Sequence, residues 1–220
     1  MEWLTQLIDF VLHINVHLAE LMQDYGPWIY LILFLIVFCE TGLVVTPILP
    51  GDSLLFAAGA LAATGGMNLW ILCAVLIVAA ILGDTANYWI GKKSGNILQR
   101  KFPRIVKPEY LVRTNAFFER YGGKTIIFAR FVPIVRTFAP FVAGAGAMSY
   151  GRFMMFNVVG ALLWVLLLVP AGYLFANVEF VKKNFSAVIL GIIVISILPG
   201  VIEVMRERNR LKREKANGTK

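Results

Sequence analysis

The stretch CETGLVVTPILPGDS, residues 39–53, interrupts a long apolar region with two carboxylates, two prolines and a glycine. Proline removes a backbone donor and breaks an α-helix, and glycine loosens the turn beside it. In hydrocarbon, non-helical backbone is tolerated only where protein buries it or where it lines a water-filled cavity. We therefore expect residues 28–64 to form a re-entrant helical hairpin, with Glu40 and Asp52 on either side of its break.

The composition predicts hydrocarbon surroundings for most of the chain. Of 220 residues, 59% are hydrophobic and 15% are charged, whereas soluble domains have roughly 25% charged residues. Long apolar blocks match the ~20 residues that a helix needs to cross a bilayer. We predict an all-α integral membrane protein with a single membrane domain at 28–205, whose transmembrane helices lie at 69–91, 153–176 and 185–205.

Basic residues are absent from the first 91 positions and then gather in two regions. Nine fall within residues 92–124 and seven within residues 206–220. Because loops rich in Lys and Arg stay in the cytoplasm, both regions should face that side. This topological explanation is sufficient for the net charge of +8, and we expect no nucleic-acid partner. The first region is predicted to be a cytoplasmic amphipathic segment, and the second a basic cytoplasmic tail at the C-terminus.

Residues 1–27 carry apolar and polar side chains on opposite faces of a helix, which favours an amphipathic helix on the membrane surface. His13 and His17 lie one turn apart on the polar face, but no third metal ligand is evident nearby. A solvated face is therefore preferred to a metal site. Cys39 and Cys73 both lie in apolar blocks and indicate neither a disulfide framework nor a metal site. We expect no cofactor.

Residues 125–148 resemble the opening stretch in chemistry, because two prolines break them and Arg130 and Arg136 add charge. FAAGALA (56–62) also aligns with FVAGAGA (141–147) at an offset of 85, with five of seven residues identical. Each half has a proline-bearing hairpin followed by one span. A hairpin returns to its own side, so the first enters from outside and the second from the cytoplasm. This order predicts two inverted repeats, which transporters use for alternating access.

The charges of the two hairpins are expected to converge in a polar chamber. A lone charge at the bilayer centre costs about 2.5–3.5 kcal/mol, and opposite charges that meet remove most of this cost. Arg130 and Arg136 would hold an anion, since arginine fits phosphate bidentately. Helices that start near Asp52 and Thr137 would add their positive ends. A carboxylate away from water can exchange protons, and Glu40, deeper in its apolar block, is the preferred proton carrier.

Structural roles stay open for these residues. Asp52 could only cap a helix, and the arginines could extend to the cytoplasmic headgroups. That alternative is stronger for Arg130, which lies six residues into its segment, than for Arg136, which lies twelve residues in. Asp84 is near the cytoplasmic end of its span. We expect it to anchor at the interface beside Trp89, and a secondary role at the site is left open.

The stretches ETGLVVTPILPGD (40–52) and FARFVPIVRTFAPFVAG (128–144) resemble the two signature motifs of the DedA family of bacterial inner-membrane proteins. That family is related to the eukaryotic VTT-domain lipid scramblases, and the resemblance extends from residue 3 to 205. It implies two opposed re-entrant helices with flanking spans. It also implies a role in moving lipids, including polyprenyl-phosphate carriers such as undecaprenyl phosphate, or in proton-dependent transport.

The resemblance implies roles for four residues, because the family's functional acids match Glu40 and Asp52 and its functional arginines match Arg130 and Arg136. The predicted function is a multi-pass inner-membrane transporter that flips a phosphate-bearing lipid, coupled to protons. A proton-coupled exporter of soluble cations or drugs is the alternative, although two arginines fit cationic cargo poorly. No Ser-His pair or metal cluster is evident in the hairpins, so an enzyme is not expected. The cargo, the direction, a homo-oligomeric state and the side of the N-terminal helix stay open.

Overall fold

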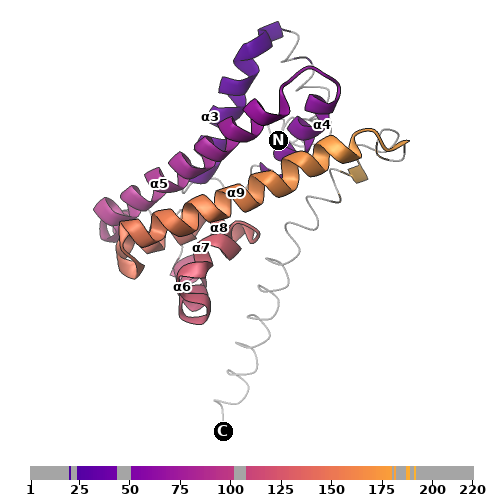
Figure 1. The fold of residues 1–220 in the computed structure, drawn as a ribbon. Coiled ribbons are helices and arrows are strands. Elements are labelled where there is room, and N and C mark those ends of the chain that lie inside the picture. The colour runs from indigo at the N-terminus through magenta and orange to yellow at the C-terminus, as the bar shows by residue number, and fades with distance from the viewer. Residues whose placement is uncertain are drawn as a thin grey trace, which may run out of the picture.

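The computed structural model describes residues 20, 24–43, 51–101, 108–179, 181, 187–188 and 191. These residues form helices joined by turns, and no strand occurs among them (Figure 1). The elements are η1 (Gly26–Trp28), α3 (Ile29–Gly42), α4 (Gly51–Ala63), α5 (Leu69–Lys101), α6 (Pro108–Tyr121), η2 (Gly122–Lys124), α7 (Thr125–Ala129), α8 (Pro133–Val142), η3 (Ala143–Ala147) and α9 (Tyr150–Phe175). The all-helical fold class is confirmed for this part of the chain.

Three predicted segments fall largely or wholly outside the described residues. They are the amphipathic helix at 1–27, the transmembrane helix at 185–205 and the basic tail at 206–220. The middle of the first break, residues 44–50, lies outside them as well.

Two of the predicted spans are confirmed as helices that are long and apolar enough to cross a membrane. α5 meets this criterion over Leu69–Lys93, and α9 meets it over Tyr150–Phe175. The two helices lie side by side and run in opposite directions (Figure 1). Consistent with this, the ring of Trp89 near the end of the α5 span lies 5.5 Å from the ring of Tyr150 at the start of α9.

The α5 helix has a defined start and an unexpectedly late end. The Asn68 side-chain oxygen accepts hydrogen bonds from the backbone N–H groups of Trp70 and Ile71, at 3.0 and 3.2 Å, which caps the helix. Trp70 and Trp89 are both exposed and stand about 28 Å apart along the axis, close to the thickness of the hydrocarbon core. The helix continues to Lys101, ten residues beyond the predicted boundary, because the first proline after the span is Pro103, two residues past that end.

The short helix α4 packs on α9, which belongs to the other half of the chain. An added Cβ at Gly59 would overlap the backbone carbonyl of Val169, and one at Gly172 would overlap that of Phe56. Glycine at both positions lets the two helix backbones approach closely, as small residues do in membrane helix packing.

The same arrangement recurs with the halves exchanged, where the segment α8–η3 packs on α5. Gly144 lies against the carbonyl of Tyr88, and Gly91 lies against that of Phe141. The offset of 85 that aligns the two heptapeptides relates Gly59 to Gly144. Each short helix therefore packs on the span of the opposite half.

Each broken segment is preceded by a turn of the same conformation, and the alignment at offset 85 did not reveal this similarity. Tyr25 and Tyr121 have φ, ψ values of −111°, −7° and −114°, −6°. Gly26 and Gly122 follow them with φ of +49° and +56°, a left-handed conformation that glycine adopts without strain. The turns η1 and η2 then lead into α3 and α7.

The predicted breaks in residues 125–148 are partly wrong. The chain leaves helical structure at residues 130–132, and Pro133 is the first residue of α8, where a missing N–H has no consequence. Pro140 lies inside this helix instead of breaking it. Thr137 is therefore in the middle of α8 and does not cap it. In the first segment, α4 begins at Gly51 and Asp52 lies in its first turn.

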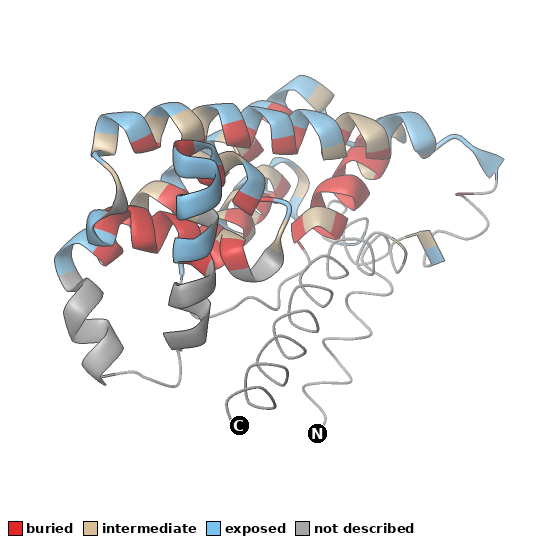
Figure 2. Cartoon of the chain, turned by 90° about the horizontal axis from the view of Figure 1, so that it is seen from below, coloured by how far each residue is buried: buried red, intermediate tan, exposed pale blue. Residues whose placement is uncertain are grey.

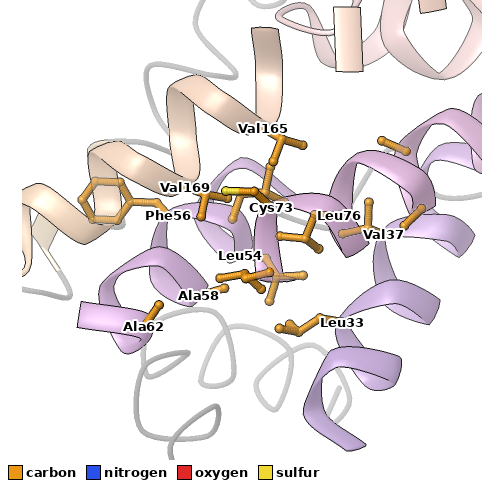
Figure 3. Close-up of a cluster of buried hydrophobic side chains, with 14 of the residues drawn as sticks. Leu33, Val37, Leu54, Phe56, Ala58, Ala62, Cys73, Leu76, Val165 and Val169 are labelled. Carbon is orange, nitrogen blue, oxygen red and sulfur yellow. The ribbon is translucent and has the colours of Figure 1, made fainter. Parts of the chain in front are cut away.

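Buried residues concentrate where the short helices contact the long ones, whereas the outer faces of the long helices are exposed (Figure 2). Apolar side chains from α3, α4, α5 and α9 form the largest cluster (Figure 3). Its members include Leu33, Val37, Leu54, Leu76, Val165 and Val169. The exposed outer faces are apolar, as contact with lipid requires, and include Leu82, Leu163 and Leu167.

Candidate functional site

Arg136 brings the two broken segments together. Its Nη2 atom lies 3.3 Å from Glu40 Oε1, and its Nη1 donates a 3.2 Å hydrogen bond to Asp52 Oδ1. Glu40 comes from the last turn of α3 and Asp52 from the first turn of α4, on either side of the first break. The Arg136 side chain is 11% exposed and the Glu40 side chain 8%, so this ion cluster is largely removed from solvent.

Asn87 of α5 ties the backbones that carry two of these charges. Its amide nitrogen donates to the carbonyl of Thr41 at 3.2 Å and to the carbonyl of Thr137 at 2.9 Å. These acceptors directly follow Glu40 and Arg136 in the sequence. The Thr41 carbonyl is one of the last four of α3, which lack partners within the helix. Asn87 thus gives a hydrogen-bond donor to a carbonyl at the end of α3 and fixes the backbone beside the Glu40–Arg136 ion pair.

Arg130 forms a second buried cluster with residues of the two spans. Its Nη2 atom donates to Asp84 Oδ2 of α5 at 2.5 Å and to Asn157 Oδ1 of α9 at 2.7 Å. Asn157 in turn donates to the backbone carbonyl of Ile81 at 3.1 Å. Arg130 and Asp84 are only 2% and 3% exposed. This cluster therefore links α5, α9 and the end of α7 inside the protein.

The indole of Trp164, on α9, touches both clusters. Its Nε1–H donates to Asp52 Oδ1 at 2.8 Å. The guanidinium carbon of Arg136 lies 4.1 Å from the ring centroid, and that of Arg130 lies 5.8 Å from it. Both distances are within the range of a cation–π interaction.

Several polar atoms of these side chains lack a hydrogen-bond partner within the part of the chain that the structure describes. They are Glu40 Oε2, Asn87 Oδ1, Arg130 Nε, Arg130 Nη1 and Arg136 Nη2, the last of which is still ion-paired with Glu40 Oε1 at 3.3 Å. Buried polar atoms are rarely left unsatisfied, and in native proteins the exceptions occur where water, an ion or a ligand binds. Three of the five are guanidinium donors, which suits an anion. The ionised clusters hold three carboxylates against two guanidiniums, so a single added proton makes them neutral.

The structure brings together most, but not all, of the predicted site. Glu40, Asp52 and Arg136 meet as expected. Arg130 does not pair with Glu40 or Asp52, and its charge partner is Asp84. Asp84 does not reach the surface as an interfacial anchor would, because its side chain is buried and paired with Arg130. Neither arginine extends to solvent, since both are largely covered.

Three contributors were missed in the sequence: Asn87, Asn157 and Trp164. The two asparagines carried a usable signal, because each is an uncharged polar residue in a long apolar block and must find a hydrogen-bond partner there. Trp164 carried no such signal, since a tryptophan inside an apolar helix ordinarily packs in the hydrophobic core. No group of three His, Cys, Asp or Glu side chains among the described residues is arranged to hold a metal ion. His13 and His17 lie outside those residues.

Comparison with known proteins agrees with these motifs. The VTT domain profile matches residues 49–174. Protein DedA of Escherichia coli K12 is 58% identical over 210 residues, which cover 94% of this chain and 96% of that protein. An uncharacterized membrane protein of Mycobacterium leprae is 45% identical over 168 residues, 76% of this chain and 75% of its own length.

A more distant relative is the inner membrane protein YghB of Escherichia coli K12, 35% identical over 170 residues, 77% of this chain and 78% of that protein. None of these relatives' names specifies a catalytic activity, and no solved structure matches the chain. The match to the domain covers more than half of the chain, and the match to DedA covers nearly all of it. The chain is therefore a membrane protein with a VTT domain and belongs to the DedA family.

Proposed function

We propose that the protein is a multi-pass transporter of the bacterial inner membrane that moves a phosphate-bearing lipid across the bilayer, coupled to protons. The observation that carries this proposal is the burial of Arg136 between two carboxylates of the other broken segment, beside a buried Arg130 whose Nε and Nη1 donors have no hydrogen-bond partner among the described residues. A phosphate has the charge and the acceptor geometry to satisfy these donors. A polyprenyl phosphate such as undecaprenyl phosphate is the substrate class that we favour.

Proton coupling follows from the charge balance of the cluster. When Glu40 takes up a proton, Arg136 loses one of its two negative partners and becomes available to the phosphate. When the phosphate leaves, the proton is released and the ion pair forms again. Only the headgroup needs the polar site, because the apolar tail can remain in the bilayer. Asp52, which also bonds to Trp164, is the second acid of this exchange.

We propose alternating access by two inverted repeats, each with a re-entrant hairpin and a span. The exchanged glycine contacts support this symmetry, because α4 packs on α9 as α8–η3 packs on α5. In addition, α3 contacts α5 as α7 contacts α9. The helices thus divide into one group of α3, α5, α8 and η3, and another of α4, α7 and α9. Orientation with both basic regions in the cytoplasm follows from the distribution of Lys and Arg.

Reconstitution tests the proposal. Purified protein in liposomes would be assayed for transbilayer movement of a fluorescent polyprenyl phosphate, with and without a pH gradient, beside a phosphate-free polyprenol. We expect phosphate-dependent movement that responds to the gradient and is abolished in Arg136→Ala. The same rate in Arg136→Ala as in the wild type, with both proteins folded, would overturn the assignment.

The alternative of a proton-coupled exporter of cations or drugs gains no support from the contacts. A cationic substrate would need a free carboxylate, whereas Glu40 and Asp52 both face Arg136. The same liposomes distinguish the two functions, because cation export predicts proton flux on addition of a soluble cation and no dependence on lipid phosphate.

A further inference from the structure

We infer that Trp164 is a positioning residue for substrate binding, which holds Arg136 in place while the arginine exchanges its carboxylate partners for the phosphate. This inference rests on the proposed function and adds a residue from the second span to the site.

The argument starts from two different contacts of one ring. The edge of the indole, through Nε1–H, bonds to Asp52 Oδ1, and the face of the indole carries the Arg136 guanidinium at 4.1 Å. Asp52 Oδ1 accepts from both groups, so Trp164, Arg136 and Asp52 form a closed triangle. Trp164 is fully buried, which restricts the ring to this orientation.

These three contacts become important when the ion pairs of Arg136 with Glu40 and Asp52 separate. Once Arg136 turns from its carboxylates to a phosphate, the charge on Asp52 loses one donor but keeps the indole N–H. The guanidinium loses two anions but keeps the aromatic face, which needs no counter-charge. Trp164 therefore keeps each separated group in a favourable contact during the exchange. The Arg130 guanidinium, 5.8 Å from the same ring, places the second arginine beside the same surface.

Ordinary core packing is the competing explanation, because Trp164 also belongs to the large apolar cluster. The two explanations differ in which property of the ring matters. Packing depends on ring volume alone, whereas positioning depends on the face for Arg136 and on the N–H for Asp52. Trp164→Phe keeps an aromatic face and removes the donor, and Trp164→Leu removes both.

The first experiment measures lipid-phosphate transport in liposomes as a function of substrate density in the membrane. For Trp164→Leu we expect the apparent KM to rise roughly 5- to 30-fold, the factor that corresponds to a desolvated cation–π contact, with a maximal rate within about threefold of wild type. Trp164→Phe, which keeps a ring face but loses the N–H donor to Asp52, should raise the KM by clearly less than Trp164→Leu does. Trp70→Leu, at a highly exposed tryptophan, is the matched control.

The second experiment gives a readout that does not need Trp164 to be removed. In a variant whose other four tryptophans are phenylalanine, the emission of Trp164 is recorded while farnesyl phosphate is added in detergent, with farnesol as the phosphate-free probe. A saturable change with the phosphate alone supports the inference. No change, in protein that still transports the lipid phosphate, overturns it.

The outcomes separate this inference from the proposed function. If the wild type neither binds nor moves a phosphate-bearing lipid, both are overturned. If it does so and folded Trp164→Leu has a wild-type KM, only the role of Trp164 is overturned. A phenylalanine variant as defective in KM as the leucine variant would also contradict the assigned function of the ring face.

Discussion

Replacing Arg136 by glutamine should separate the stability of the protein from its transport. The substitution keeps most of the side-chain volume but leaves Glu40 and Asp52, at 3.3 and 3.2 Å from the guanidinium, without their positive partner. Breaking a buried ion pair by removing one partner costs about 3–5 kcal/mol. We expect Arg136→Gln to lose about this much free energy of unfolding in detergent micelles and to lose lipid-phosphate transport in liposomes.

The decisive comparison is the fully neutral triple variant, which combines Arg136→Gln with Glu40→Gln and Asp52→Asn. Replacing a whole buried ionic network by neutral groups is often close to neutral in stability. The triple variant should therefore regain most of the lost unfolding free energy, yet remain inactive in transport. Lowering the pH should also reduce the loss in the single variant, because protonated carboxylates need no positive partner.

Two results would refute this reasoning. An unfolding free energy of Arg136→Gln within about 0.5 kcal/mol of wild type would mean that the cluster is solvated like a surface ion pair. Wild-type transport by the folded triple variant would show that these charges are not part of the transport machinery. Lys124→Gln, at an exposed basic residue, controls for the loss of one positive charge.

Three further substitutions test the supporting contacts, each through the free energy of unfolding. Asn87→Asp keeps the shape but removes both amide donors, so two buried carbonyls lose their bonds and at least about 2 kcal/mol is lost. Asp84→Asn leaves the Arg130 guanidinium without a charge partner and should lower the free energy of unfolding by about 3–5 kcal/mol. If Asp84 were only an exposed anchor at the interface, the same substitution would lower it by less than about 1 kcal/mol. Gly59→Ala should destabilise by about 1–3 kcal/mol, because its Cβ overlaps a backbone carbonyl of α9, while Gly151→Ala meets open space and should not destabilise.

The sequence predicted those features that follow from hydrophobicity and from helix breakers. The α5 and α9 spans follow from apolar blocks of sufficient length, and the meeting of Glu40, Asp52 and Arg136 follows from the cost of leaving any of them alone in hydrocarbon. Opposite charges in two interrupted segments have few other ways to lower that cost.

Pairing specificity could not be predicted in the same way. The cost of a lone charge indicates that Arg130 needs an acid but does not select among the acids, and Asp84 was given only a secondary role because of its position near the predicted end of a span. That end was placed too early, because the helix continues through the polar residues after Trp89 to Lys101. Likewise, Pro133 and Pro140 look alike in sequence, and only the backbone distinguishes a first-turn proline from one inside a helix.

Under the proposed alternating access, the exchanged packing determines which contacts the movement would have to break. Glycine contacts that hold backbones together lie within each of the two helix groups, between α5 and α8–η3 and between α9 and α4. The side-chain contacts instead cross from one group to the other, namely the bonds of Arg136 to Asp52 and of Arg130 to Asp84 and the apolar cluster of α3, α4, α5 and α9. Polar contacts can be exchanged for water, phosphate or a proton, whereas tight backbone packing has no such substitute. We therefore expect opening to occur between the groups, so that a disulfide engineered across α5 and α9 stops transport and its reduction restores it. Unchanged transport with that disulfide formed would place the movement elsewhere.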